Sequence, residues 1–325
     1  MSDRSRFIIA LVILFVALVA MTVVSLSLGS TRVDPSKVFR EGSVDAVIVF
    51  DIRLPRTLAA IVAGAAFSVA GLLIQTASSN ALASPNIIGV NSGAGFAVLV
   101  FLAFFPQLYH LLPLAAFLGA LVAVSLVFLI SSTTRRIPST SSLILSGIAV
   151  NALFNALIST LASLEPDVMG TYSAFSVGGF ASVDMDQLAP AAILIVLSIA
   201  AVFPLSRIMD IARLSDEIAS SLGYRPQRIR ILLMALACLM AASAVSFAGL
   251  LGFVGLVVPH VASFLCPGGS RRTLTLSLLA GPLLVLVADF LGRMVMRPSE
   301  LPAGVFMALV GVPFFIFLLT RRSRS

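Results

Sequence analysis

Apolar stretches long enough to cross a lipid bilayer follow one another through nearly the whole of this 325-residue chain. A transmembrane helix needs about 20 predominantly apolar residues. Stretches near that length lie at 7–29, 57–77, 87–105, 112–131, 142–163, 188–204, 231–248, 250–266, 274–292 and 302–320. The sequence therefore predicts an all-α integral membrane protein with about ten transmembrane helices.

The composition leaves no room for a soluble domain, since 59% of the residues are hydrophobic and only 11% are charged. We therefore expect a single transmembrane domain over 1–325. The stretch 250–266 is the least regular, because two glycines and Pro259 interrupt it. A further short helix is expected within 166–185.

The distribution of cations predicts the orientation, because short loops rich in Arg and Lys stay in the cytoplasm. With a cytoplasmic N-terminus, most of the 21 Lys and Arg residues fall on the cytoplasmic side, and both termini are cytoplasmic. The net charge of +7 is then explained by topology, without a nucleic-acid partner. Arg4 and Arg6 would also suit a secretory signal, but the apolar run 7–29 is longer than a signal core of 7–15 residues.

The chain has no visible energy source of its own. Its one lysine, Lys37, lies in a loop, so the sequence contains no glycine-rich phosphate loop ending in Lys-Ser/Thr, and we do not expect an enzyme. Ion coupling needs ionisable groups inside the membrane, and the candidates are Asp289 and His260. Asp289 has Arg293 one helical turn away, which favours a pair within one helix. The two cysteines suit apolar packing, and neither a cofactor nor a metal site is expected.

A short internal repeat indicates two halves of opposite orientation. Ser68-Val-Ala-Gly-Leu-Leu73, near the end of the second stretch, recurs as Ser246-Phe-Ala-Gly-Leu-Leu251 near the end of the seventh. In the predicted topology these two stretches run in opposite directions. Inverted repeats of this kind are typical of transporters. We therefore expect two inverted five-helix halves.

An uncharged polar segment between the second and third stretches is the first candidate for a transport pathway. Irregular polar backbone at membrane depth is tolerated only beside protein or a water-filled cavity. The candidate gate or pathway residues in it are Gln75, Asn80, Leu82 and Asn91. Helix packing explains the segment equally well, because small residues recur every four positions around Gly93 and around Gly64.

A second candidate gate lies at the cytoplasmic start of the fifth stretch. Ser139, Thr140 and Ser141 carry hydroxyl groups there, which could line a gate or only cap the helix. Asn151 and Asn155 follow one turn apart on the same helix. They could line the same path or form hydrogen bonds to neighbouring helices.

The longest charged interruption, 207–230, is predicted to contain a short helix. Ser215 suits its N-cap, the acids Asp216 and Glu217 suit its first turn, and Gly223 suits its end. Because this is the largest cytoplasmic feature of a chain without its own energy source, we expect the helix to dock a separate ATPase.

Several dispersed motifs resemble the FecCD-type permeases, the membrane subunits of ABC importers for iron–siderophores, haem and cobalamin. The resemblance covers about residues 50 to 320. It is carried by Arg53-Leu-Pro-Arg56, Gly64-Ala65, Gly71, Gln75, Asn80, Pro85, Gly255-Leu-Val-Val-Pro259-His260, Ala288-Asp289, Glu300-Leu-Pro302-x-Gly304 and Gly311-x-Pro313-x-Phe315.

The resemblance implies a type II ABC importer permease of ten spans in the cytoplasmic membrane of a bacterium or archaeon. It implies pairing with a second permease subunit, identical or different, above two cytoplasmic ATPases and below a substrate-binding protein. Arg53, Arg56 and Arg293 resemble the sites that receive acidic residues of the binding protein. The hydroxyl run at 139–141 and the loop near Asn80 resemble inner gates.

The coupling helix of the family resembles the stretch from Asp216 to Gly223. Its positions here are Asp216, Glu217, Ala219, Leu222 and Gly223. The chain departs from the family where Ala81 follows Asn80 in place of proline, and in the loop 261–272, whose role is not transferred. The cargo stays open among siderophore, haem and cobalamin. An ion-coupled secondary transporter and an integral-membrane enzyme are the alternatives.

Overall fold

The computed structural model describes residues 3–322 except 30, 32, 35, 41, 134–139, 215, 297 and 298. Ten main helices follow one another in this part of the chain: α1 (Asp3–Ser27), α3 (Leu54–Ser78), α4 (Val90–Phe104), α5 (Leu112–Thr133), α6 (Thr140–Leu164), α8 (Met185–Ala212), α10 (Pro226–Ala248), α11 (Val254–Leu265), α12 (Ser270–Val295) and α13 (Ala303–Arg322). Shorter segments connect them: α2 (Val44–Val47), η1 (Ile48–Arg53), η2 (Pro85–Ile88), η3 (Pro106–Leu111), η4 (Pro166–Val168), α7 (Met169–Val177) and α9 (Asp216–Ser221).

Each predicted stretch corresponds to one main helix, so the predicted helical membrane fold is confirmed. Among the described residues, seven helices are long and apolar enough to cross a membrane, and three others, within α4, α11 and α13, are shorter and apolar. The irregular stretch 250–266 forms a helix only from Val254 onward. The additional short helix expected within 166–185 is present as α7.

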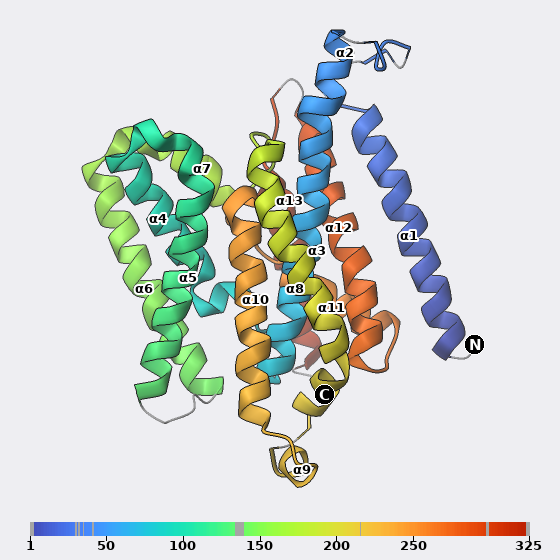
Figure 1. The fold of residues 1–325 in the computed structure, drawn as a ribbon, viewed down its shortest axis with the longest axis vertical. Helices are drawn as coiled ribbons and strands as arrows, with labels where there is room; N and C mark the ends of the chain where they lie inside the picture. The colour runs from blue at the N-terminus through green and yellow to red at the C-terminus, as the bar shows by residue number, and fades with distance from the viewer. Residues whose placement is uncertain are drawn as a thin grey trace.

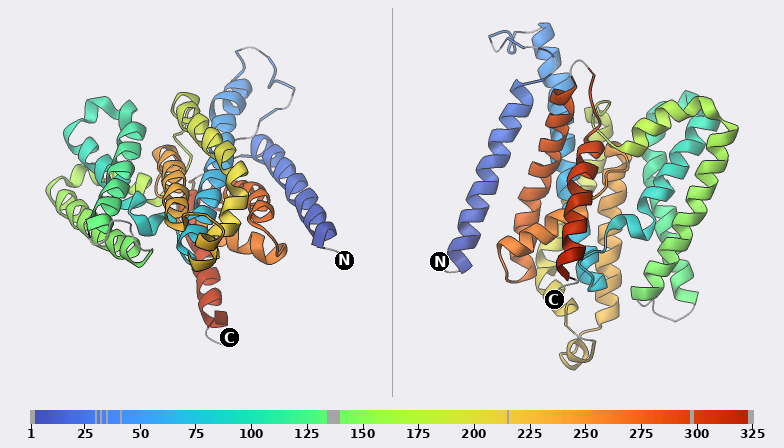
Figure 2. Two further views of the ribbon diagram at one scale, coloured as in Figure 1. Left: turned by 60° about the horizontal axis from the view of Figure 1, so that its bottom comes forward. Right: turned by 180° about the vertical axis from the view of Figure 1, so that it is seen from behind.

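The main helices run alternately in opposite directions, and both chain ends lie at the same end of the bundle (Figure 1, and from behind in Figure 2). We call this end, which also carries α9, the termini face. The other end, which carries α2, is called the opposite face. The second main helix, α3, runs toward the termini face, whereas its counterpart α10 runs away from it (Figure 1). This is the reversal expected for inverted halves.

Helix α3 forms the centre of the core and packs against α8, α10, α11 and α12. Small residues allow this close approach. A side chain at Gly64 would collide with the backbone of Gly281, and one at Gly71 with the backbone of Gly255. Helices in lipid associate largely through such packing, because lipid is as apolar as the helix surface.

Two residues with left-handed backbone geometry end the helices α3 and α10. Ser79 (φ 50°) ends α3, and Gly249 (φ 70°) ends α10, each in the left-handed half of backbone space. At Gly249 a Cβ would also strike the carbonyl oxygen of Phe175, so glycine fits this turn for two reasons. The two copies of the internal repeat therefore differ locally: the first lies inside α3, whereas the second spans the end of α10.

Candidate functional site

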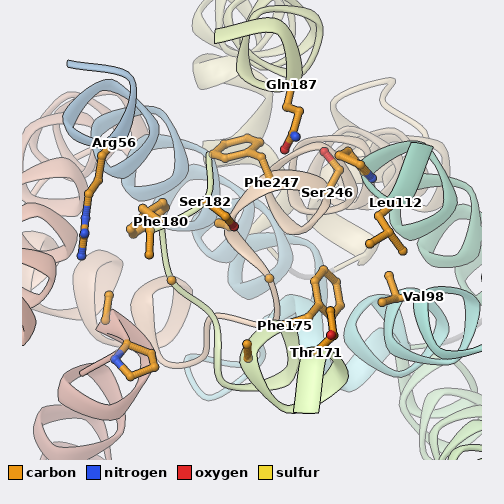
Figure 3. A pocket seen from close by; sticks show the side chains of 18 of the residues that line it. Arg56, Val98, Leu112, Thr171, Phe175, Phe180, Ser182, Gln187, Ser246 and Phe247 are labelled. Atoms are coloured by element: carbon orange, nitrogen blue, oxygen red, sulfur yellow. The ribbon is translucent and has the colours of Figure 1, made fainter. Parts of the chain in front are cut away.

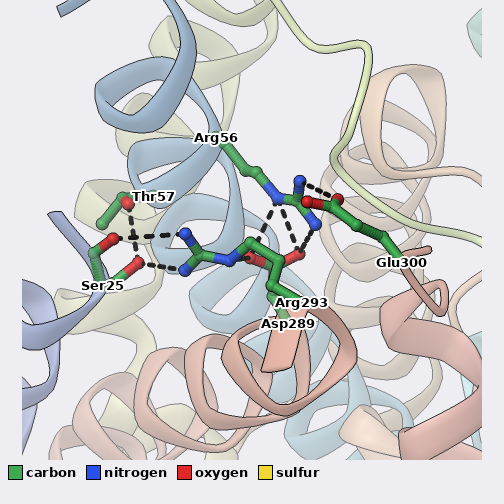
Figure 4. A network of polar contacts seen from close by, with 6 residues as sticks. All are labelled: Ser25, Arg56, Thr57, Asp289, Arg293 and Glu300. Atoms are coloured by element: carbon green, nitrogen blue, oxygen red, sulfur yellow. Dashed lines mark hydrogen bonds and ion pairs between the residues drawn. The ribbon is translucent and has the colours of Figure 1, made fainter. Parts of the chain in front are cut away.

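A cluster of charged side chains is buried near the opposite face, where α3, α12 and the segment after α12 meet (Figure 4). Its centre is Arg56, which lies in the first turn of α3 directly after Pro55. The Nε atom of Arg56 donates to both carboxylate oxygens of Asp289 at 3.0 and 3.1 Å, and Nη2 donates to Oδ1 at 2.9 Å. Its Nη1 donates to Oε2 of Glu300 at 2.6 Å. The planar guanidinium thus engages two carboxylates at once.

Arg293 extends the cluster from α12 toward α1. Its Nε lies 3.2 Å from Oδ2 of Asp289, an ion pair without hydrogen-bond alignment. Its Nη2 donates to the hydroxyl of Ser25 at 2.6 Å, and that hydroxyl lies 2.9 Å from the hydroxyl of Thr57 (Figure 4). The predicted pair between Asp289 and Arg293 is therefore present, but Asp289 also forms an ion pair with Arg56.

Arg53 lies beside the cluster and caps the C-terminal end of α1. Its Nη1 donates to the carbonyl oxygens of Leu26 and Ser27 at 2.8 Å each, and Nη2 donates to that of Thr31. These carbonyls have no intrahelical partner, and the negative end of the helix dipole favours a cation there. Gly29 leaves room for the guanidinium, because a Cβ at this position would collide with it.

All three arginines predicted to receive the binding protein are thus buried, with exposed fractions of 4% for Arg53, 8% for Arg56 and 3% for Arg293. Buried charges need partners, and these have them within the chain. The carboxylate of Glu300 remains 29% exposed, so the cluster meets the surface at the Arg56–Glu300 pair. Docking by these arginines stays a prediction.

A cavity of about 230 Å³ adjoins this exposed edge of the cluster (Figure 3). It is lined by Arg56 and Glu300, by parts of α4, α5, α7 and α10, and by the segment before α8. Aromatic side chains from Phe175, Phe180 and Phe247 alternate with polar groups from Ser182 and Gln187 (Figure 3). An apolar wall with a few polar groups is typical of a small-molecule site.

A second cavity, of about 330 Å³, lies at the termini face. Two predicted pathway residues, Gln75 and Asn80, line it. The Nε2 atom of Gln75 donates to the carbonyl oxygen of Gly255 at 3.1 Å, which ties α3 to the start of α11. Asn80 accepts a hydrogen bond from the amide of Leu82 at 3.0 Å and so fixes the turn after α3.

The remaining candidates of the polar segment and of α6 lie elsewhere. Asn151 donates to the carbonyl oxygen of Asn86 at 3.1 Å and accepts from the hydroxyl of Ser92 at 2.6 Å. It therefore bonds across helices, one of its two predicted roles. The Oδ1 atom of Asn91 is buried without a hydrogen-bond partner, and Asn155 lies on the exposed side of α6.

The predicted hydroxyl gate falls mostly outside the described residues. Ser139 and the side chain of Thr140 lie outside the described residues, and Ser141 is exposed in the first turn of α6.

The predicted coupling helix is present as α9, and Gly223 follows its end with a φ of 82°. Ser215 and the side chain of Asp216 lie outside the description.

On α9, Ala219 is fully buried, whereas Glu217 is exposed. Ile218 and Leu222 expose 52% and 58% of their surfaces. The helix therefore offers an apolar surface together with an acidic one at the termini face.

Sequence reasoning did not identify Glu300 or Ser25 as parts of the charged cluster. Glu300 belongs to a quoted motif, but nothing in its spacing indicates contact with Arg56. Ser25 gives no signal at all, because a serine inside an apolar helix most often bonds to its own backbone. Only the packing of α1 against α12 brings it to Arg293.

Comparison with known proteins covers almost the entire chain. The model of the FecCD transport family matches residues 16–321. The Fe(3+)-citrate import system permease protein YfmE of Bacillus subtilis (strain 168) is 32% identical, over 99% of this chain and 98% of YfmE. The ferric enterobactin transport system permease protein FepD of Escherichia coli (strain K12) is 36% identical, over 96% of this chain and 95% of FepD.

A solved structure of a metal-chelate type ABC transporter in an inward-facing conformation has the same fold. It matches with a TM-score of 0.85 at 28% identity, over 96% of this chain and 98% of that one. Sequence and structure therefore agree from one end of the chain to the other: this protein belongs to the FecCD transport family.

Proposed function

We propose that this chain is the membrane-spanning permease subunit of an ABC importer that carries a ferric chelate, of which an iron–siderophore complex is the foremost candidate. The observation that carries the proposal is the family match over residues 16–321. It is supported by relatives named as permeases for Fe(3+)-citrate and ferric enterobactin, which align over nearly their full lengths.

The orientation in this proposal follows from the distribution of charge. We assign the termini face to the cytoplasm. In the predicted topology most Arg and Lys residues of the sequence belong to this side, and short loops rich in Arg and Lys stay in the cytoplasm. The membrane is the cytoplasmic membrane of a bacterium or archaeon. The opposite face, with the charged cluster, then meets an extracytoplasmic binding protein.

Partner subunits supply what this chain lacks. A cytoplasmic ATPase is proposed to bind α9, whose exposed Ile218 and Leu222 suit an apolar groove and whose acid Glu217 suits a basic rim. A second permease subunit, identical or different, completes the pathway.

The docking role of the arginines is proposed in a modified form. Arg56 reaches the surface through its pair with Glu300, so a carboxylate of the binding protein would approach at that edge. Arg53 and Arg293 would support this site from within, since Arg53 fixes the end of α1 and Arg293 fixes Ser25.

Reconstitution tests the proposal. The permease, its ATPase and its binding protein are placed in proteoliposomes, and uptake of radiolabelled ferric siderophore, ferric citrate, haem and cobalamin is measured. We expect uptake of one ferric chelate that requires both ATP and the binding protein. Uptake driven by a proton or sodium gradient without ATP would instead identify an ion-coupled secondary transporter.

A further inference from the structure

The cavity at the termini face is rich in hydrogen-bond donors. Four different elements contribute to its wall: the end of α3 with the turn after it, the segment after α8, the second half of α11, and the first turn of α12. The polar residues in the wall are Gln75, Thr76, Ser79, Asn80, Arg213, His260, Ser263 and Thr273. A pocket assembled from four elements is set by the tertiary fold rather than by one local motif.

Two buried threonines contribute hydroxyl groups to this wall, and the hydroxyl of Thr76 is left without a partner by the fold. The Oγ1 atom of Thr76 is buried and makes no hydrogen bond, although Thr76 is only 2% exposed. Thr273 is also 2% exposed. An unsatisfied buried hydroxyl costs free energy, and a ligand that accepts its hydrogen bond removes this cost.

An amide group adds a third donor. Because the Oδ1 atom of Asn80 already accepts from the backbone amide of Leu82, the Nδ2 group is the end that remains for a ligand. Ser79, beside it, adopts a φ of 50°, which is uncommon for a residue other than glycine. The turn that carries Ser79 and Asn80 into the cavity wall therefore has an uncommon backbone conformation.

The charge of the wall has one sign. Arg213 and His260 are its ionisable residues, and none of the described residues that line the cavity is acidic. Arginine pairs with carboxylate and phosphate groups through two parallel hydrogen bonds, and an imidazole N–H can add another. An oxyanion is bound best by hydrogen-bond donors and a positive charge, with no carboxylate nearby to repel it.

We propose that this cavity is an oxyanion site, which binds a carboxylate-bearing ligand at the termini face. The inference rests on the proposed function in one respect: the carboxylate is assigned to the chelator of the cargo on its way out of the permease. The volume of about 330 Å³ accommodates a group of this size. The phosphate of a lipid headgroup has the same chemistry and is the competing source.

Thermal unfolding of the purified full-length permease tests the site without any partner protein. Cys238 and Cys266 are both buried free thiols, so a thiol-reactive dye reports unfolding when they become exposed. Sodium citrate, ferric citrate and inorganic phosphate are titrated against sodium chloride at equal ionic strength. We expect citrate or ferric citrate to raise the unfolding temperature saturably, as a ligand that binds only the folded state must.

Two variants remove donors, and each has a matched control. Arg213→Gln and Thr76→Val should each weaken citrate binding by about tenfold, because each variant removes one hydrogen bond to a charged group. Arg228→Gln changes an exposed arginine of α10 outside the cavity, and Thr275→Val changes a half-buried threonine of α12 whose hydroxyl bonds to its own helix. These two should bind like the wild type. Should Thr76→Val fail to fold, the exposed Arg213 still provides the test.

The possible outcomes separate the sources. Saturable binding of citrate that is lost in Arg213→Gln supports the proposal. Two outcomes would assign the site to lipid headgroups and overturn the assignment to cargo. One is saturable binding of phosphate but not of citrate. The other is that citrate raises the unfolding temperature only after added anionic lipid has been removed. No saturable shift with any oxyanion overturns the site itself. Because this assay needs neither ATP nor binding protein, its failure is distinguishable from failed uptake in proteoliposomes.

Discussion

Arg56 and Asp289 form a buried ion pair across 233 positions of sequence, with an N–O distance of 2.9 Å. The pair joins α3 in the first half of the chain to α12 in the second half. Since Asp289 is only 1% exposed, its charge depends on the two arginines that face it. The two halves are therefore tied together by electrostatics as well as by small-residue packing.

We predict that Asp289→Asn destabilises the folded protein strongly, by about 3–5 kcal/mol, because it removes the buried carboxylate that faces both Arg56 and Arg293. Glu300→Gln should cost less, since the Glu300 side chain is 29% exposed, whereas that of Asp289 is buried. Thermal unfolding with the thiol-reactive dye measures both variants. Equal losses for the two substitutions would contradict the central position of Asp289.

The contact between α3 and α11 predicts a strict requirement for glycine at position 71. In Gly71→Ala the new methyl group meets the backbone of Gly255, so the two helices must separate. We expect a clear drop in the yield of folded, monodisperse protein in detergent. Gly170→Ala is the matched control, because Gly170 also lies in a helix but a Cβ there has nothing within 4 Å. A folded yield for Gly71→Ala equal to that control would show that the contact is dispensable.

The start of α12 depends on a side chain from α8. The N-cap of α12 is Gly269, which has no side chain, and the amide of Ser270 donates instead to Oδ1 of Asp210 at 2.6 Å. Asp210→Ala should destabilise by about 0.5–2 kcal/mol, the usual cost of losing a cap. Asp210→Asn retains an acceptor and should lose much less. Hydrogen exchange in the first turn of α12 checks the assignment, and faster exchange in both variants alike would argue against it.

Docking of the ATPase predicts an effect of charge on α9. Asp216→Arg combined with Glu217→Arg should abolish co-purification of the ATPase and ATP-driven uptake while leaving the binding protein attached. The control double variant, Glu165→Arg with Asp167→Arg, reverses two acids near the opposite face and should keep the ATPase bound. Normal ATPase binding by the α9 variant would remove this helix from the interface.

The ten spans could be predicted from sequence because each is a local property of about 20 apolar residues. The residues at which α3 and α10 end were harder to predict. Ser79 adopts a positive φ without any local signal, and at Gly249 the constraint is a contact with Phe175 on another helix. Hydrophobicity alone does not indicate where a helix ends when the reason is a neighbour.

The candidate site shows the same division. The pair of Asp289 with Arg293 was predictable, since four residues separate them on one helix. The bonds of Arg53 to the end of α1 were not, because they join backbone carbonyls to a side chain about 25 positions later, and helix packing decides which carbonyls come within reach. The pair made by local spacing was therefore predictable, whereas the partners of Arg53 depend on tertiary contact and were not.

The attachment of α1 has a consequence for the order of synthesis. This helix leaves the ribosome before the helices that it packs against, and it is long and apolar enough to insert into the bilayer on its own. Its anchors are made later, and Arg293, which holds Ser25, is translated 268 residues afterwards. During translation α1 can be held early by Arg53 and Thr57, but its contact with Arg293 has to wait for α12. Completion of α12 then adds this contact, so the last quarter of the chain determines when the attachment of the N-terminal helix is complete.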